Sequence, residues 1–468
     1  MKKRLISLIL AAIVLLSCAF AEESQSEEYL LPYIDLYAVP LGENALFEIP
    51  NEWGYQTSDA ADLPPTTSLL TDQNQMVMAM KLPADWEATD ASDALGIQSF
   101  IVEGTALMLG LTTPQSTRLQ EMTINDMPAV LVEMNGQGFD ILWIGDSGDL
   151  YFFLFPNDDD ALVQQMISVA QSLCVFHRKG EQVNPASDFA YTADGGEVTI
   201  TDYIGTSEHV LIPDTIDGLP VTALADKAFY EKTVTTVVVP DSVTEIGDLC
   251  FSGDNYLVSL TLPDELAELP YAALESCFRL MDFNLPKELK KISGSALQYN
   301  YYLTHLTLPS SLTEIEQLNF IGLYGLQSLT IAEDNAAFKL DETNGLLMTA
   351  DGTRLLHCFS DIVPAEEIIL PEGVKIVDPF AFHYDYDVER IVLPEGVETI
   401  GAMAFAMCPN LTEIVIPASV TDIGVMDGLE GRTGIISYKR NVIVTPEGCP
   451  AWNWAVETGA TVKSPEEN

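Results

Sequence analysis

Residues 391–411 read IVLPEGVETIGAMAFAMCPNL and residues 237–251 read VVVPDSVTEIGDLCF. In both stretches a short apolar run ends at a proline, and further apolar residues follow at the same offsets. Prolines recur every 23 residues in two series, at Pro240, Pro263, Pro286 and Pro309 and then at Pro371, Pro394 and Pro417. A fixed period of this length indicates an internal structural repeat.

Each repeat predicts a strand with one buried face. Counted from the proline as position zero, positions −3, −1, +3 and +6 are apolar in every unit, and position +11 is Phe or Leu in six of them. One unit buries only about six apolar side chains at roughly 1.5–3 kcal/mol each, which does not offset about 1–2 kcal/mol of backbone entropy per residue. The units must therefore stack, and the sequence predicts a right-handed solenoid with a parallel sheet.

The repeat resembles the BspA-type leucine-rich repeat of bacterial surface proteins over about residues 188–462. The pattern departs from that family at Leu274 and Leu297, which replace Phe, at Ala332, which replaces Pro, and in residues 424–434, which lose the phase. The resemblance implies adhesion or protein recognition at a bacterial surface.

The gap from Pro309 to Pro371 predicts an insertion at about 333–366, where Asn344-Gly345 and Asp351-Gly352 indicate hairpin turns. This hairpin is either a projecting contact element or a structural lid over the edge of a coil. A terminal cap is expected at about 442–462, with a short helix from Pro450 to Gly459.

The first mature segment, residues 29–178, contains no repeat and predicts an α+β domain. Strands are expected at 47–50, 76–80, 129–134, 141–144 and 150–155, and helices at 91–104 and 161–174. The Phe-x-Ile-Pro-x-x-Trp start at Phe47 and the closing strand and helix are weakly similar to PsbP-like α/β/α sandwiches. Residues 179–187 are expected to be a polar linker.

The N-terminus predicts export. Basic residues 2–4 precede an apolar stretch, and Ala19-Phe20-Ala21 offers a cleavage site, which together indicate a signal peptide at 1–21. The alternative is that residues 15–18 are a lipobox and that Cys18 is the lipid anchor. The expected location is therefore secreted or at the extracellular cell surface, with no membrane span.

The net charge of the chain limits the classes of partner that it can bind. The chain has 70 acidic and 21 basic residues, a formal net charge of −49. Such a chain cannot neutralise phosphates and is repelled by anionic membranes, so nucleic acid is excluded as a partner. We expect an extracellular protein of a host or of a bacterial surface, or a glycan.

The sequence contains none of the common catalytic motifs, so we predict no enzyme activity, no catalytic residues, no metal and no cofactor. The acidic run at 157–160 could bind Ca²⁺, but it also fits the start of a helix. Cys277 and Cys408 lie five coils apart, about 24 Å at about 4.8 Å per coil. They therefore cannot form a disulfide, and we interpret them as core residues.

Positions −4 and −2 are expected to point outward from the strands and to form the binding face. The first coils offer mostly hydroxyls and amides there, at Thr236, Ser259, Thr261, Asn284, His305 and Thr307. Later coils offer an apolar row, Ile369, Val392 and Val415, flanked by Glu367, Arg390 and Glu413. An apolar patch with a charged rim is typical of a protein interface, although β-branched residues also simply favour strands.

The sequence thus predicts a secreted or surface-anchored protein that mediates adhesion or protein recognition through its solenoid. One alternative is a ligand carrier or enzyme centred on residues 29–178, which a deep polar pocket would favour and a filled core would oppose. Another is a purely structural spacer.

Overall fold

The computed structural model describes residues 36–41, 45–50, 54–58, 66–70, 76–82, 117–124, 127–134, 139–145, 150–156, 160–171, 173–175, 183–359, 362–425, 435–436 and 441–466. The predicted signal peptide, Cys18, the predicted helix at 91–104 and residues 157–159 of the acidic run lie outside these ranges. The chain divides into two compact units, Met1–Gln182 and Val183–Asn468, and each is described by itself.

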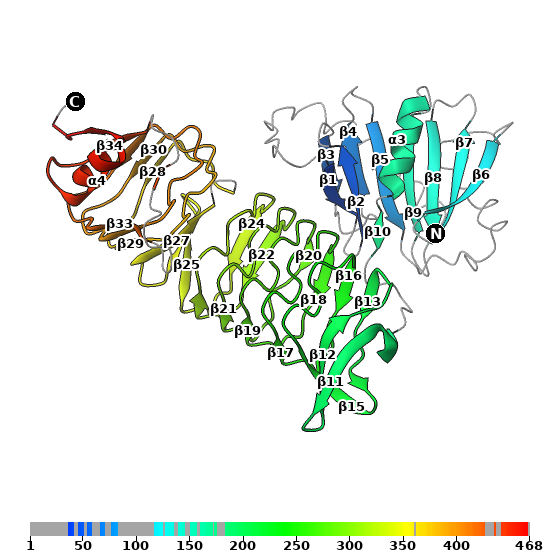
Figure 1. Cartoon of the computed structure of the whole chain (residues 1–468). Coiled ribbons are helices and arrows are strands. Elements are labelled where there is room, and N and C mark those ends of the chain that lie inside the picture. Colours follow the sequence, from blue (N-terminus) through cyan, green and yellow to red (C-terminus); the bar gives the residue numbers. More distant parts are fainter. Residues whose placement is uncertain are drawn as a thin grey trace. The chain divides into compact units, whose positions relative to one another are not determined.

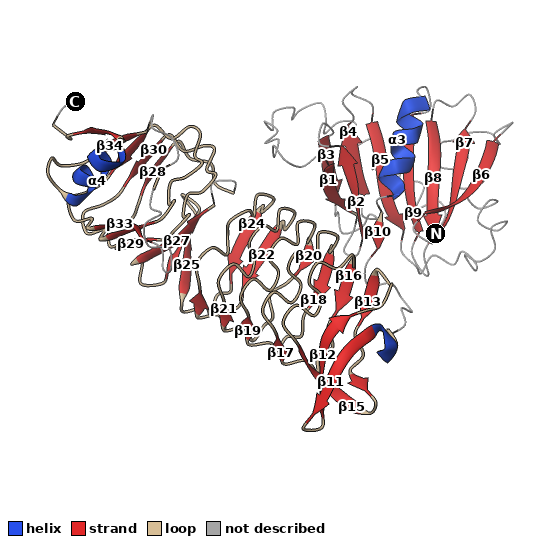
Figure 2. Cartoon of the chain, viewed as in Figure 1, coloured by secondary structure: helices blue, strands red, loops and turns tan. Residues whose placement is uncertain are grey.

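The first unit is an antiparallel sheet with a helix packed on it, so the predicted α+β class is confirmed (Figures 1 and 2). The main sheet has the order β3-β4-β5-β9-β8-β7-β6, and β1-β2-β10 form a second, smaller sheet. The strands are β1 Leu36–Pro40, β2 Ala45–Pro50, β3 Gly54–Ser58, β4 Thr66–Leu70, β5 Met76–Leu82, β6 Thr117–Ile124, β7 Met127–Met134, β8 Phe139–Gly145, β9 Leu150–Pro156 and β10 Cys174–Val175.

Helix α3, Asp160–Gln171, packs against β9 and β2. It is shorter than the predicted 161–174, because the chain turns after Gln171 and Cys174 starts β10, which pairs with β2. Alternating apolar residues of β9, namely Tyr151, Phe153 and Phe155, are fully buried under the helix side chains. The described core of this unit is therefore filled by aromatic and aliphatic side chains.

The second unit is the predicted solenoid, whose coils each have two strand sides and one side of turns (Figures 1 and 2). We call the strands just before the prolines the first side. They are β13 His209–Leu211, β16 Thr236–Val238, β18 Ser259–Thr261, β20 Asp282–Phe283, β22 His305–Leu308, β24 Ser328–Ile331, β28 Glu367–Ile369, β30 Arg390–Val392, β32 Glu413–Val415, β34 Val442–Val444 and β35 Thr461–Lys463.

The second side carries the strands that follow the prolines. They are β12 Glu197–Tyr203, β15 Leu219–Leu224, β17 Glu245–Ile246, β19 Glu268–Leu269, β21 Lys291–Ile292, β23 Glu314–Ile315, β29 Ile376–Val377, β31 Thr399–Gly401 and β33 Asp422–Val425. Neighbouring coils pair in parallel with a shift of one repeat, as in Ile368↔Ile391↔Ile414. The proline ends the pairing because it has no N–H to donate.

The entry, the insertion and the exit of the solenoid each have their own elements. The turn η1 Ala186–Asp188 and strand β11 Phe189–Asp194, antiparallel to β12, start the unit, and β14 Thr215–Ile216 pairs with β15. The insertion contributes β25 Phe338–Asp341, β26 Leu346–Thr349 and β27 Arg354–Cys358. Because β27 pairs with β29, these strands extend the second side, which favours the structural interpretation over a projecting contact element.

The exit is closed by helix α4, Pro450–Thr458. Cys449 caps its start, since its sulfur accepts from the N–H of Trp452 at 3.4 Å, and Gly459 ends it with a left-handed φ of 74°. Ala451 and Ala455 of α4 are buried against the last coils. The small side chains let the helix lie close to the coil that it covers.

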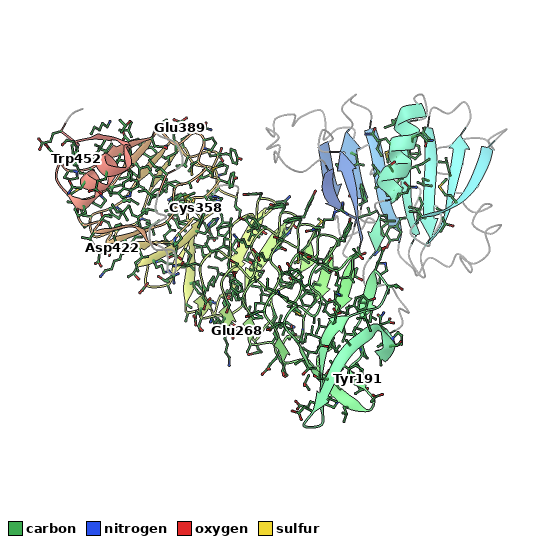
Figure 3. All side chains as sticks on the ribbon, in the orientation of Figure 1. Tyr191, Glu268, Cys358, Glu389, Asp422 and Trp452 are labelled. Atoms are coloured by element: carbon green, nitrogen blue, oxygen red, sulfur yellow. The ribbon has the colours of Figure 1, made fainter. Side chains whose placement is uncertain are left out.

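The predicted inward positions fill the interior (Figure 3). Every residue predicted at −3, −1, +3 and +6 is buried except Ile423, which is partly buried. Position +11 is buried as well, in Phe251, Leu274, Leu297, Phe320, Phe382 and Phe405. Cys277 and Cys408 are buried free thiols, as predicted.

In three coils position +14 places a hydrogen-bond donor in the core. Cys277 Sγ donates to the carbonyl of Phe251 at 3.1 Å, Asn300 Nδ2 to that of Leu274 at 3.1 Å, and Cys408 Sγ to that of Phe382 at 2.8 Å. Each of these bonds joins a coil to the coil before it. Asp254 occupies the same position one coil before Cys277, is completely buried, and neither of its carboxyl oxygens has a hydrogen-bond partner.

The side of turns repeats a backbone feature that the sequence did not reveal. Positions +9 and +13 have positive φ in every regular coil, although only Gly253 and Gly322 are glycines. The other residues are Leu249, Ala272, Ser276, Ser295, Tyr299, Leu318, Phe380, Tyr384, Met403 and Met407. A left-handed non-glycine residue costs roughly 1–2 kcal/mol, so stacking of the coils must offset this cost in every turn.

Candidate functional site

The predicted binding face lies on the first side, and all eight predicted site residues are found there. Thr261, Asn284, His305, Thr307 and Ile369 are exposed, and Arg390, Val392 and Val415 are half-buried. They do not form one cluster. Thr261 belongs to the sheet of β13–β20, His305 and Thr307 to β22–β24, and the last four to β28–β35, beyond the insertion.

Two residues predicted to point outward are buried. Thr236 is 4% exposed and Ser259 is 2% exposed. The imidazole Nδ1 of His209 lies 3.0 Å from Thr236 Oγ1, and Ser259 Oγ donates to Asp282 Oδ2 at 2.6 Å. Long side chains of the adjacent strands thus cover these short hydroxyl side chains, and this part of the prediction was wrong.

The polar part of the face is already hydrogen-bonded along the ladder. The hydroxyls of Thr307 and Thr330, on adjacent strands, are 2.7 Å apart, and Thr304 Oγ1 lies 2.8 Å from His305 Nδ1. These contacts use part of the hydrogen-bonding capacity that a ligand would need.

The apolar part of the face is an in-register row, which we call the apolar row: Ile369, Val392 and Val415, followed by Val444. Ile369 is 56% exposed, whereas Val444 is only 6% exposed. Burial therefore increases toward the C-terminal end, where Lys463 follows Val444 in the register. The accessible part of the row is centred on Ile369, Val392 and Val415.

A row of charged side chains runs beside it. Arg390 donates to Glu367 through Nη1 and to Glu413 through Nε, the latter at 2.8 Å, and Lys463 Nζ lies 2.9 Å from Glu413 Oε2. Hydrogen bonds from Arg390 and Lys463 lower the pKa of Glu413, and Glu413 and Glu367 raise the pKa of Arg390. Such exposed pairs contribute little stability, but they hold the charged groups in place next to the apolar row.

A second feature, missed by the sequence analysis, lies on the side of turns. We call it the aromatic ladder: Phe278, Tyr301, Tyr324, Tyr384 and Tyr386. Phe278 stacks on Tyr301 with ring centroids 4.8 Å apart, Tyr301 stacks on Tyr324 at 5.6 Å, and Tyr384 meets Tyr324 edge-on at 5.5 Å. Position +15 is aromatic in four repeats, so continuing the alignment four residues past position +11 would have found it.

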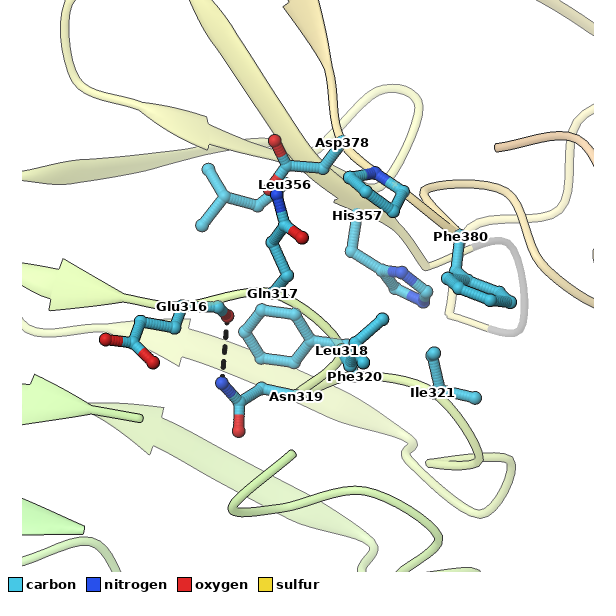
Figure 4. A pocket seen from close by; sticks show the side chains of 11 residues that line it. Glu316, Gln317, Leu318, Asn319, Phe320, Ile321, Leu356, His357, Asp378 and Phe380 are labelled. Atoms are coloured by element: carbon cyan, nitrogen blue, oxygen red, sulfur yellow. Dashed lines mark hydrogen bonds between the residues drawn. The ribbon is translucent and has the colours of Figure 1, made fainter. Parts of the chain in front are cut away.

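A small pocket lies where the insertion meets the turns (Figure 4). Three of its polar side chains already have partners. The Asp378 carboxylate accepts hydrogen bonds from Arg354 Nε at 2.6 Å and from Arg354 Nη2 at 2.8 Å. Glu316 forms an ion pair with Lys291 at 2.7 Å, and Asn319 Nδ2 donates to the Glu316 carbonyl at 2.9 Å. The pocket therefore offers few groups for a ligand. Burial lowers the pKa of His357, which lines it, to about 3, so this imidazole is neutral.

The described residues show neither a cluster of metal ligands nor an activated cysteine among the buried thiols. No group of three His, Cys, Asp or Glu side chains that could hold a metal ion occurs within the described ranges. Burial raises the pKa of Cys250, Cys277 and Cys408, so these thiols are not activated nucleophiles. Among the helices that the structure describes, none has the length and apolar character needed to cross a bilayer.

The parallel sheets, the 23-residue period and the buried positions define a leucine-rich-repeat solenoid. The family model described as BspA type Leucine rich repeat region matches residues 222–341 and 356–426 in 6 copies. The repeats of this chain are therefore BspA-type leucine-rich repeats, and the resemblance is confirmed. Proteins with these repeats are bacterial surface or secreted proteins, and the repeats serve protein interaction.

Solved structures of leucine-rich repeat proteins are among those similar to the chain. The chain is 26% identical to a leucine-rich repeat protein of T. pallidum, covering 49% of this chain and 91% of that one, with a TM-score of 0.34. It is 18% identical to a leucine rich cell surface protein of Faecalibacterium prausnitzii, covering 61% and 96%, with a TM-score of 0.39. No curated protein matches the chain.

A third solved structure concerns the PsbP-like prediction. The chain is 12% identical to cyanobacterial PsbP of Synechocystis sp. PCC 6803, covering 33% of this chain and 99% of that one, with a TM-score of 0.25. This similarity is weak, and the PsbP-like fold of residues 29–178 stays a prediction.

Proposed function

We propose that this protein is an adhesin, secreted or held at the bacterial surface, that binds a partner protein through the apolar row and the charges beside it. The observation that carries the proposal is the register Ile369↔Val392↔Val415 with Glu367↔Arg390↔Glu413 alongside. A row of accessible apolar side chains rimmed by fixed charges is the composition of a protein interface.

The alternative of a ligand carrier or enzyme in the first unit gains no support from the described residues. The aromatic side chains of β9 fill the space between the sheet and α3, and Phe47 and Phe153 pack edge-on at 5.3 Å. A core packed in this way counts against a ligand between the sheet and α3.

The test compares variants of the mature chain on immobilised extracellular matrix proteins. Val392→Asp places a carboxylate in the centre of the apolar row, and we expect at least a tenfold loss of affinity for a protein that the wild type binds. Thr307→Asp is the matched control, because it adds the same charge to the same side outside the row; we expect less than a twofold change.

Arg390 requires a neutral substitution. Its charge reversal would align three carboxylates on adjacent strands about 4.8 Å apart, which would destabilise the sheet itself. Arg390→Gln keeps a polar side chain, although a shorter one, and removes the charge. Equal losses for Val392→Asp and Thr307→Asp, with circular dichroism showing both variants folded, would contradict the proposed face.

A further inference from the structure

The aromatic ladder offers ring edges and hydroxyls rather than ring faces. The Phe278 and Tyr301 planes are 3° apart and those of Tyr301 and Tyr324 are 13° apart, so each ring covers the face of the next. All five side chains of the ladder are nevertheless half-exposed. A sugar ring that must lie flat on an aromatic face would find both faces of Tyr301 in the middle of the stack occupied, which disfavours a glycan there.

The tyrosine tips are available as hydrogen-bonding groups. In the part of the chain that the structure describes, no hydrogen bond engages the hydroxyl of Tyr301 or Tyr324. Burial raises the pKa of both groups, so both hydroxyls remain protonated and neutral. Each can accept a hydrogen bond from a cationic donor, and neither repels one.

On this side of the solenoid, basic side chains of the chain itself pack on tyrosine rings. Lys227 lies over the Tyr230 ring at 5.1 Å, and Arg279 lies over the Tyr256 ring at 5.8 Å. Within the described residues, no Lys or Arg lies over Phe278, Tyr301 or Tyr324. With 70 acidic and 21 basic residues, the chain can supply few cations of its own, and its field attracts those of a partner.

We propose that the aromatic ladder is a second docking surface, which takes an arginine-rich extended segment of a partner protein. The guanidinium presents up to five N–H groups, and the tyrosine hydroxyl oxygens at the tips of the rings can accept them. Tyrosine and arginine are also the residues that dominate binding energy at protein interfaces. The surface spans successive coils, so a segment lying along the solenoid meets one aromatic rung after another.

The probe is a fluorescently labelled deca-arginine peptide, measured by anisotropy at physiological salt. For Tyr301→Ala with Tyr324→Ala we expect at least a tenfold loss of affinity. Tyr301→Phe with Tyr324→Phe keeps the stack and removes only the hydroxyls, so the fold is retained, and we expect a loss of about threefold, the effect of roughly one hydrogen bond.

The matched control separates the ladder from general electrostatic attraction. Glu268→Gln with Glu314→Gln removes two exposed charges from the second side, and we expect less than a twofold change. A loss in this control as large as that in the Tyr→Ala pair, or wild-type affinity in the Tyr→Ala pair, overturns the proposal. Deca-lysine is expected to bind at least threefold more weakly than deca-arginine, and equal affinities also overturn it.

The result is independent of the proposed adhesive face. Val392→Asp is expected to leave deca-arginine binding unchanged, because the apolar row belongs to β28–β32 rather than to the side of turns. A parallel loss of matrix-protein binding and of deca-arginine binding in Val392→Asp would show a single surface and overturn the proposal of a second one.

Discussion

Replacing Asp254 by asparagine is expected to stabilise the solenoid. The carboxyl of Asp254 is fully buried at position +14, where Cys277, Asn300 and Cys408 donate to a carbonyl of the preceding coil. A carboxylate cannot donate such a bond, and burial in the core disfavours its charge more than the nearby backbone N–H groups of Tyr256 and Leu257 favour it. Burial raises the pKa of Asp254 from 3.8 to about 8.

The pKa shift gives the magnitude. In the unfolded chain the Asp254 carboxyl is ionised at pH 7, because pH 7 lies about three units above its unfolded pKa of 3.8. Each pH unit corresponds to about 1.4 kcal/mol in the free energy of protonation. Retaining the proton in the folded state therefore costs on the order of 4 kcal/mol. Asp254→Asn supplies a neutral donor of the same size, and we expect a gain of about 2–4 kcal/mol in the free energy of unfolding at pH 7.

The pH dependence tests the reasoning. Between the unfolded and folded pKa values the folded state holds one proton more, so the wild type loses stability from about pH 4 to about pH 8 and no further above that. Urea unfolding followed by circular dichroism at pH 4, 5.5, 7 and 8.5 measures the free energy of unfolding of both proteins. The difference in favour of Asp254→Asn should increase from pH 4 to about pH 8 and stay constant above that. Asn300→Asp should show the opposite trend, and an advantage of Asp254→Asn that is independent of pH would refute this account.

Two further predictions concern two histidines, His357 and His383, and the contacts between coils. Burial lowers the pKa of His357 to about 3 and that of His383 to about 4, so below about pH 6.5 the unfolded state takes up protons that the folded state does not, and stability falls as the pH drops toward 4. His357→Phe should reduce the drop in Tm between pH 7 and pH 5, while the same change at the exposed His305 should not; equal pH responses would exclude this origin. Gly401→Ala should prevent close stacking of its coil, because a Cβ there would lie 2.2 Å from the backbone nitrogen of Pro379, whereas Gly294→Ala, with its nearest neighbour at 3.6 Å, should be tolerated. Thermal unfolding measures both, and a similar Tm for the two variants would contradict the packing argument.

The period of the solenoid could be predicted because its physical requirement is local and repeated. Each coil must bury the same few positions, so Leu, Ile and Val recur at −3, −1, +3 and +6, and the structure buries almost all of them. Position +11 was predictable for the same reason. The insertion left a measurable gap between Pro309 and Pro371 and two turn signals.

The features that could not be predicted depend on contacts with adjacent strands and coils rather than on the repeat pattern of the sequence. Thr236 and Ser259 occupy outward positions but are covered by His209 and Asp282 of adjacent strands. The left-handed positions +9 and +13 are mostly not glycine, so composition gives no sign of them. In the first unit, β3 Gly54–Ser58 and β4 Thr66–Leu70 were missed, because their polar residues do not alternate with apolar ones as in a half-buried strand.

The register of the coils has a consequence for how such a protein can change in length. Strand partners and the cross-coil hydrogen bonds join residues about one repeat apart, as in Glu367, Arg390 and Glu413. Duplication or loss of one whole coil would give each remaining coil an equivalent neighbour, while a gain of one residue within a strand would shift the register of that strand against the coils on both sides. The solenoid can therefore lengthen its docking surfaces in steps of a complete turn without redesign of its interior.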